Sequence, residues 1–327
     1  MIVRAPTELS SGVDELLERL GPLYGLGDEL APLREVSAAL PVVPLEASAS
    51  LHARTDSRDL RVTVGLPSRS ALSSLLESLD VRAAGEPAVG ALVLAARDAR
   101  ERRFPYGAAL RARTGHPVRP RPAAWLGGST VAERSMRVDA ALRSVGLEEP
   151  ANRSRRLADI LGSNPFSGVI PYGLGLDLGE TEATGAKVYF ACESAEVVLG
   201  HLHGPIADEL ALGDQTAAFD ALVDVIGPEW RRRRWLLEIS FELPADPASG
   251  ARAKLYAPAP SLAVTSIAAH RAILSIASKL GFDAAPYEAL VRALRPQGLP
   301  DDRPPTLSVG VSVTAASPSL EAYVFLR

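Results

Sequence analysis

The feature that most constrains the fold of this chain is a strand-pair pattern that recurs from its start to its end. Apolar residues alternate with polar ones over 45–52, and they alternate with Arg61 and Thr63 over 60–66. Successive side chains of a β-strand point to opposite faces, so such a pair has one apolar and one polar face. Four further pairs show the same alternation, namely 123–128 with 134–140, 169–178 with 185–192, 235–243 with 252–258, and 307–313 with 320–327. The sequence therefore predicts five antiparallel hairpins.

Helical segments fill the gaps between the predicted hairpins. Residues 68–79 begin with a serine suited to a helix cap and carry a leucine stripe. Similar spacing occurs over 152–161, 215–225, 261–280 and 286–294. The second strands end at a period of about 65 residues, which indicates a repeated helix-helix-strand-strand unit. We therefore expect an α+β fold, with five such repeats forming a ten-stranded antiparallel sheet under one layer of helices, and we treat residues 1–327 as a single domain.

The polar face of this sheet could lie on the surface or in the interior of the protein. An open sheet would expose the face to solvent, whereas a closed sheet would turn it into the interior of a barrel. Aromatic side chains recur on this face, which a solvated surface has little reason to repeat: Tyr189, Tyr256, Tyr323 and Phe325. Arginines and lysines interleave with them. This arrangement favours a closed β-barrel surrounded by a ring of helices, with an open-sheet interaction protein as the alternative.

Lysine is rare in this chain, and two of its three lysines have the same surroundings. The segments Lys187-Val188-Tyr189 and Lys254-Leu255-Tyr256 each place an ammonium group and a phenol on one face of a strand. Basic residues occupy interior positions in four of the predicted hairpins: Arg61, Arg137, Lys187, Arg252 and Lys254. Gathered at one end of a barrel, they could neutralise a diphosphate. Any one of these basic residues, considered alone, could instead be a strand residue that faces solvent.

A carboxylate and three tyrosines complete the candidate site. Glu46 is the first interior residue of the first strand, where it could accept a proton from an attacking acceptor. A salt bridge to Arg61 explains the same residue equally well. The faces of Tyr189, Tyr256 and Tyr323 could shield a carbocation from water. Ordinary aromatic packing inside a barrel is the alternative.

Charge and composition argue against several other classes of function. A net charge of −4 and a pI near 5.8 provide no basic surface for nucleic acid. The sequence has neither a signal-peptide h-region at its start nor an apolar stretch long enough to span a membrane. The single cysteine, Cys192, fits a reducing compartment, and the five scattered histidines indicate no metal site. We expect a cytoplasmic protein that binds neither nucleic acid nor membrane.

The motifs of this chain resemble those of the aromatic prenyltransferases of the ABBA fold. Segments 44–48 and 60–64 are similar to the first hairpin of that family. In this likeness Glu46 stands at the place of the family's base, and Arg61 at its first diphosphate-binding arginine. The segments around Lys187 and Lys254 resemble later strands, which carry lysine and tyrosine for the diphosphate and for shielding the allyl cation. Residues 132–139 look more like the cyanobactin-type peptide prenyltransferases than the longer fungal enzymes.

The resemblance implies an enzyme that moves a dimethylallyl or geranyl group from its diphosphate, DMAPP or GPP, to an electron-rich acceptor. That acceptor would be a residue of a cyclic ribosomal peptide. Prenylation of a free indole or phenol is one alternative, and a non-catalytic barrel that binds an amphipathic anion is another.

The resemblance also implies roles for individual residues. Glu46 is catalytic. Asp139 has no counterpart in the resemblance, but a carboxylate at this position could hold a magnesium ion or repel the diphosphate. The implied diphosphate ligands are Arg61, Arg137, Lys187, Arg252 and Lys254. The implied prenyl pocket consists of Tyr189, Tyr256, Tyr323 and Phe325. We expect the protein to act as a monomer.

Overall fold

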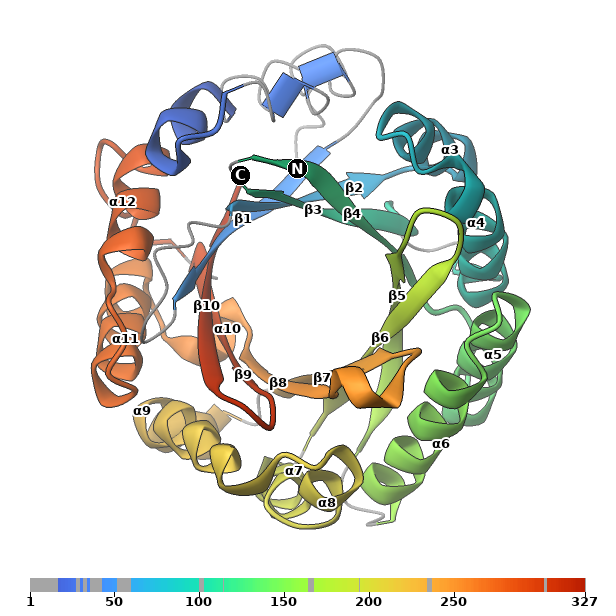
Figure 1. Ribbon diagram of the computed structural model, residues 1–327. Coiled ribbons are helices and arrows are strands. Elements are labelled where there is room, and N and C mark those ends of the chain that lie inside the picture. Colours follow the sequence, from blue (N-terminus) through green and yellow to red (C-terminus); the bar gives the residue numbers. More distant parts are fainter. Residues whose placement is uncertain are drawn as a thin grey trace.

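Ten antiparallel strands close into a barrel, which confirms the predicted fold class (Figure 1). Each strand pairs with its neighbours in the sequence, and β1 pairs with β10 to complete the ring. Closure removes the unpaired edges that an open sheet would expose. The computed structural model describes residues 17–27, 30–31, 34–35, 43–51, 60–99, 103–113, 115–163, 168–193, 195–233, 237–302 and 305–326.

The strands form five hairpins in sequence order. They are β1 (Val43–Leu51) with β2 (Leu60–Leu66), β3 (Tyr106–Arg113) with β4 (His116–Trp125), β5 (Ile170–Leu178) with β6 (Ala183–Cys192), β7 (Leu237–Pro244) with β8 (Arg252–Ala257), and β9 (Leu307–Val313) with β10 (Pro318–Phe325). Because neighbouring strands are antiparallel throughout, all five hairpin connections lie at one end of the barrel, here called the hairpin end. The opposite end, where the chain passes to the helices, is the helix end.

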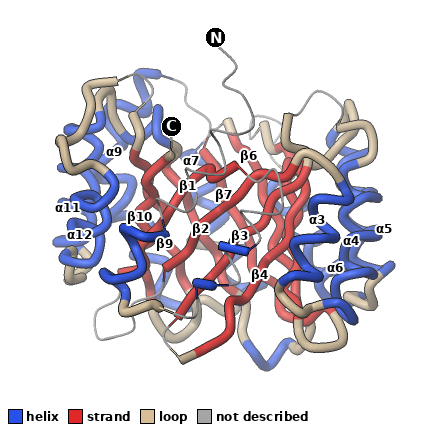
Figure 2. The backbone as a smooth tube through the Cα atoms, turned by 90° about the horizontal axis from the view of Figure 1, so that it is seen from above, coloured by secondary structure: helices blue, strands red, loops and turns tan. Residues whose placement is uncertain are grey.

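A layer of helices covers the outer face of the barrel (Figures 1 and 2). The helices are α3 (Arg69–Ser78), α4 (Arg82–Ala96), α5 (Val131–Ser144), α6 (Glu148–Gly162), α7 (Ala195–Leu202), α8 (Pro205–Leu210), α9 (Ala218–Arg233), α10 (Ala259–Leu262), α11 (Ser266–Lys279) and α12 (Ala285–Leu294), with short 3-10 turns η2 (Gly213–Ala217) and η3 (Pro247–Ser249). Within the described residues, no helix combines the length and apolarity that a membrane span requires.

The apolar core lies between the outer face of the barrel and the helices. Outward strand residues such as Val62, Val188 and Val311 are buried, and they belong to one cluster with helix residues such as Leu72 and Ile273. Burial of each such side chain contributes about 1.5–3 kcal/mol relative to exposure. With the apolar face packed outward, the polar face of every strand is turned into the barrel.

The second hairpin lies earlier in the chain than the sequence analysis placed it. The predicted strand 123–128 coincides with β4 only over 123–125, and the predicted strand 134–140 is wrong, because residues 131–144 form α5. A capping box starts that helix. The Thr130 hydroxyl accepts a hydrogen bond from the Glu133 amide, and the Glu133 carboxylate accepts one from the Thr130 amide. This local signal for a helix start outweighs the weak alternation that suggested a strand.

Prolines conceal β4 from sequence inspection, because proline cannot donate to a β-ladder. The Trp125 amide donates toward β3, to Pro105, whereas the Leu126 amide donates toward β5, to Tyr172. Amides of even-numbered residues therefore point toward β5, and Pro120 and Pro122 fall in this set. β4 pairs with β5 only over residues 123–125. The two prolines thus lie where no β5 partner requires an amide hydrogen.

Candidate active site

Interior side chains follow the same order on several strands, with charge nearer the hairpin end. On β6, Lys187 lies nearer the hairpin end than Tyr189, and on β8 Lys254 lies nearer it than Tyr256. On β7, Glu242 lies nearer the hairpin end than Glu238. Tyr189, Tyr256 and Glu238 point inward but remain only half-buried, so solvent reaches this part of the interior. The interior therefore has a charged zone and, toward the helix end, an aromatic zone.

One ion cluster in the charged zone surrounds Glu242. Its Oε1 atom lies 2.8 Å from Arg121 Nη1 and 3.1 Å from Lys187 Nζ, and its Oε2 atom lies 3.6 Å from Arg252 Nη1. Arg121 also pairs with Asp177, at 2.6 Å. Burial alone would raise the pKa of the Glu242 carboxyl, but Arg121 and Lys187 hold that pKa well below its ordinary value. Glu242 is therefore ionised at neutral pH.

A second ion cluster surrounds Glu321. This carboxylate pairs with Arg61 at 2.6 Å, accepts a hydrogen bond from the Ser48 hydroxyl at 2.9 Å, and accepts another from Lys254 Nζ. Lys254 also donates to the hydroxyl of Tyr323. Burial lowers the pKa of Lys254 to about 7, against the opposing effect of Glu321. The ion pair with Glu321 thus favours the charged form of this lysine.

Basic groups outnumber the carboxylates that pair with them in these two clusters. Five cationic side chains are held by three carboxylates, with Asp177, Glu242 and Glu321 as the acids and Arg61, Arg121, Lys187, Arg252 and Lys254 as the bases. The clusters together carry a net positive charge inside the barrel. An anion with several oxygen atoms matches this arrangement, because arginine offers paired donors and lysine a compact charge.

Tyrosine rings lie against both lysines. Lys187 Nζ lies 5.2 Å from the ring centre of Tyr189 and 5.6 Å from that of Tyr256. Lys254 Nζ lies 4.7 Å from the ring centre of Tyr256 and 4.8 Å from that of Tyr323. Ring faces at these distances attract positive charge. The three predicted tyrosines therefore border the charged zone.

A second aromatic group extends toward the helix end. Trp125 stacks on Tyr172 with ring centres 5.3 Å apart, and Tyr172 lies 5.9 Å from Tyr189. The hydroxyl of Tyr172 donates to Glu238 Oε2 at 2.7 Å. Glu238 is also the ladder partner of Tyr256. A carboxyl group is thus enclosed by aromatic side chains.

Glu46 lies in the interior, on the first strand. Its ladder partners are Thr63 and Phe325, and the Thr63 hydroxyl donates to its carboxyl group at 3.0 Å. Arg61 pairs with Glu321 and not with Glu46, so the salt-bridge alternative is wrong. Burial raises the pKa of Glu46 to about 7. A carboxyl group with this pKa can accept and return a proton near neutral pH.

Arg137 and Asp139 lie outside the barrel, so the placement predicted for both residues is wrong. Arg137 on α5 pairs with Asp98 at 3.0 Å and donates to the carbonyl of Arg97. Asp139 accepts hydrogen bonds from Arg143 at 2.9 and 3.1 Å. The predicted strand is a helix, and neither side chain can reach the interior. The described residues contain no cluster of three or more histidine, cysteine or acidic side chains suited to a metal.

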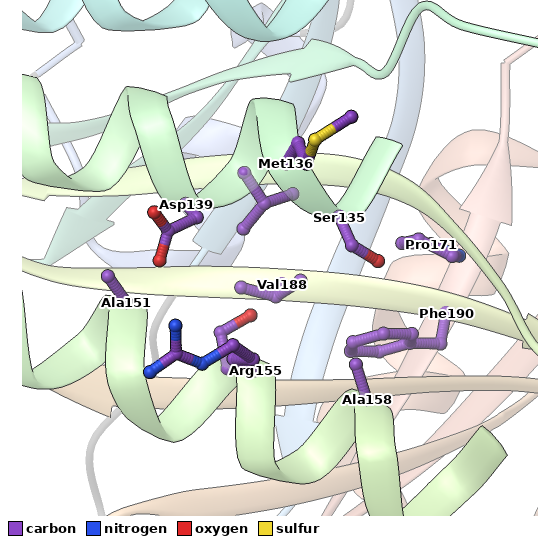
Figure 3. Close-up of a pocket in the computed structure, with 11 residues that line it drawn as sticks. Ser135, Met136, Asp139, Ala151, Arg155, Ala158, Pro171, Val188 and Phe190 are labelled. Carbon is purple, nitrogen blue, oxygen red and sulfur yellow. The ribbon is translucent and has the colours of Figure 1, made fainter. Parts of the chain in front are cut away.

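Asp139 borders a separate cavity of about 240 Å³ between α5, α6 and the outer face of the sheet (Figure 3). Val188 and Phe190, the outward neighbours of Lys187 and Tyr189, form part of its wall. This cavity lies on the opposite face of β6 from the charged zone.

Several residues of this site were missed by the sequence analysis, among them Arg121, Tyr172 and Glu242. Arg121 was lost with the misplaced second hairpin. Tyr172 lies at a β-bulge, where the ladder shifts between Pro171 and Gly173, so it breaks the simple alternation. Glu242 had a usable signal, because it continues the interior alternation of Glu238 along the same predicted strand.

Interior glycines provide the space that the large side chains occupy. A Cβ atom at Gly310 would overlap the side chain of Lys254 and come within 3.1 Å of the Tyr256 ring. A Cβ atom at Gly173 would come within 3.2 Å of Tyr189. These strands therefore carry glycine where their neighbours carry the functional side chains.

Known structures share this barrel, although no family model and no curated protein matches the sequence. The crystal structure of 6-dimethylallyltryptophan synthase from Micromonospora olivasterospora, in complex with DMASPP and Trp, has a TM-score of 0.72 at 19% identity and covers 97% of both chains. The prenyltransferase PriB in its apo form has a TM-score of 0.74 at 15% identity and covers 97% of this chain and 96% of its own. AnaPT from Neosartorya fischeri has a TM-score of 0.63 at 17% identity and covers 86% of this chain and 78% of its own. The similarity establishes the fold.

Proposed function

We propose that this protein transfers a prenyl group from an allylic diphosphate to an electron-rich aromatic acceptor inside the barrel. The observation that carries this proposal is the pair of ion clusters, positively charged overall and bordered by tyrosine rings. One similar barrel, PriB, is a prenyltransferase by name, and another is named a 6-dimethylallyltryptophan synthase and was solved with DMASPP and Trp. Their names support the reaction class proposed for this chain.

The ion clusters would bind the diphosphate of the donor. Its oxygen atoms would compete with Glu242 and Glu321 for the five basic side chains. When the carbon–oxygen bond of the donor breaks, the electron pair leaves with the diphosphate, and the nearby cations stabilise that charge. The faces of Tyr189, Tyr256 and Tyr323 would then stabilise the allylic cation and exclude water.

Glu46 would accept the proton that the acceptor loses. The acceptor attacks the allylic carbon from the aromatic zone, a new carbon–carbon or carbon–heteroatom bond forms, and the proton passes to the carboxylate. With a pKa of about 7, Glu46 is part-ionised at neutral pH and suited to this step. Phe325, the ladder partner of Glu46, would contribute to the prenyl pocket.

Donor length and acceptor size are finer parts of the proposal. DMAPP and GPP both remain candidate donors. The peptide acceptor implied by the resemblance stays a prediction, and a free aromatic molecule is its alternative. The charged zone serves either acceptor equally, because it would contact only the diphosphate.

The decisive experiment compares the three lysines of the chain. Lys187 and Lys254 are buried in the ion clusters, whereas Lys279 is exposed on α11 and pairs with Asp224. The protein is incubated with DMAPP or GPP and a panel of aromatic amino acids, arylalkylamines, phenols and cyclic peptides. Diphosphate release and the mass of the product are measured.

We expect Lys187→Ala and Lys254→Ala each to lower turnover by about 10²–10³, and Lys279→Ala to leave it unchanged. Near-wild-type turnover in both buried variants would overturn the proposal. Donor binding without diphosphate release from any mixture would instead identify a non-catalytic barrel.

A further inference from the structure

We propose that Glu238 and the rings around it bind a protonated amine of the acceptor. This inference rests on the proposed function, since it describes what the acceptor carries. It defines the acceptor class as aromatic molecules with a free amine, such as arylalkylamines and aromatic amino acids.

The immediate surroundings of Glu238 are aromatic. Tyr172 donates to its carboxyl group at 2.7 Å, and Tyr256 is its ladder partner on β8. Tyr172 in turn stacks on Trp125 and lies 5.9 Å from Tyr189. Because Glu238 is only half-buried, a molecule in the interior can reach it.

The charge of Glu238 is not balanced within the described part of the chain. Glu242 and Glu321 each pair with basic side chains, whereas the hydrogen-bond partner of Glu238 is the neutral hydroxyl of Tyr172. No described lysine or arginine forms an ion pair with Glu238. Burial raises the pKa of its carboxyl group, since an ionised carboxylate without a countercharge is costly there. A cationic ligand would supply the missing charge.

An ammonium group fits this site better than a metal ion does. Aromatic faces attract an organic cation, and a carboxylate accepts its hydrogen bonds. Hard metal ions require several oxygen ligands, whereas a single carboxyl group and aromatic rings surround this point. The chemistry therefore selects a protonated amine.

The position of Glu238 also orients the acceptor. Glu238 lies four residues from Glu242 along β7, or about 13 Å nearer the helix end. Glu46 lies on β1, which β8, β9 and β10 separate from β7. An acceptor held by its amine at Glu238 would direct its ring across the interior, toward Glu46 and the charged zone.

The test measures binding without a donor, so it does not depend on catalysis. Isothermal titration calorimetry compares tryptamine with N-acetyltryptamine, which has the same ring but no basic amine. We expect the protein to bind tryptamine about tenfold more tightly. Glu238→Gln should abolish this preference, because the amide keeps an acceptor for Tyr172 but loses the charge. Glu86→Gln, on the exposed surface of α4, should retain it.

Tyr172→Phe provides a second variant that keeps the ring. Loss of the hydroxyl should raise the pKa of Glu238 further, so that tight tryptamine binding begins at a higher pH than in the unaltered protein. Equal affinity of the protein for both ligands, or an undiminished preference in Glu238→Gln, would overturn the inference. Diphosphate release with an acetylated acceptor would then leave the proposed function standing. An amine preference without diphosphate release from any mixture would support the amine site and overturn the proposed function.

Discussion

At the scale of single residues, two carboxylates organise the interior of the barrel. Glu242 and Glu321 are almost surrounded by basic side chains, and they keep five cations in place in the protein without ligand. Such buried pairs add little net stability, because the charges lose their hydration. These ion pairs instead hold the basic side chains in position before an anion binds.

Removal of the Glu321 charge should destabilise the free protein and strengthen its response to an anion. We expect Glu321→Gln to lower the free energy of unfolding by about 3–5 kcal/mol, because Arg61 and Lys254 lose their countercharge. Pyrophosphate should then raise the melting temperature more in this variant than in the unaltered protein. Thermal melts with and without pyrophosphate measure both effects, with Glu86→Gln as the control. A smaller pyrophosphate shift in Glu321→Gln would contradict the proposed anion site.

The pKa of Glu46 leads to a prediction on pH dependence. Burial raises this pKa to about 7, so the carboxylate that accepts the proton disappears as the pH falls below that value. We expect turnover to fall about tenfold per pH unit on the acid side. Glu46→Gln should lower turnover by about 10²–10⁴ and remove this acid limb. An unchanged acid limb in the variant would assign it to another group.

At the scale of elements, glycine-bearing strands decide how close the functional side chains can come. β9 carries Gly310 beside Lys254 and Tyr256, and β5 carries Gly173 beside Tyr189. These two glycines thus leave room for the lysine and tyrosine side chains of the neighbouring strands β8 and β6.

Gly310→Ala should displace Lys254 without removing any functional group. We expect a loss of about 1–3 kcal/mol in the free energy of unfolding, because the added methyl group overpacks the interior. Turnover should fall as well, since Lys254 moves. The matched control is Gly90→Ala, at an exposed position of α4 with open space around it, which should stabilise the protein by about 0.5–1 kcal/mol. Full activity in Gly310→Ala would show that the position of Lys254 is not critical.

The same elements explain which parts of the structure the sequence could predict. Four of the five hairpins follow from alternation, because each has one apolar face that the helices must cover. β4 is not predicted because its prolines are typical of a loop. Residues 134–140 of α5 alternate weakly like a strand, although the capping box at Thr130 marks the start of a helix. The ion pairs of the interior could not be predicted either. Several of them join strands that are not sequence neighbours, such as β4 with β7 and β2 with β10, and these partners depend on how the barrel closes.

At the scale of the whole molecule, closure creates the candidate site. Lys187 and Lys254 lie on different hairpins, and Arg61 reaches Glu321 across β1. In an open sheet the β2 and β10 side chains that meet here would lie at distant edges. Prediction of the barrel therefore identified Glu46, Arg61 and the two lysines as interior residues, whereas their pairing with Glu242 and Glu321 emerges only from the closed ring.

The pairing of β1 with β10 also affects how the protein is made. The ribosome has to synthesise residues 52–317 after β1 before its last partner emerges, which takes roughly 15–50 s. During that time one edge of β1 has no strand to pair with, and such edges promote aggregation. The nascent chain therefore spends most of its synthesis in a state that chaperones can recognise. Low temperature and slow expression should favour the yield of folded protein.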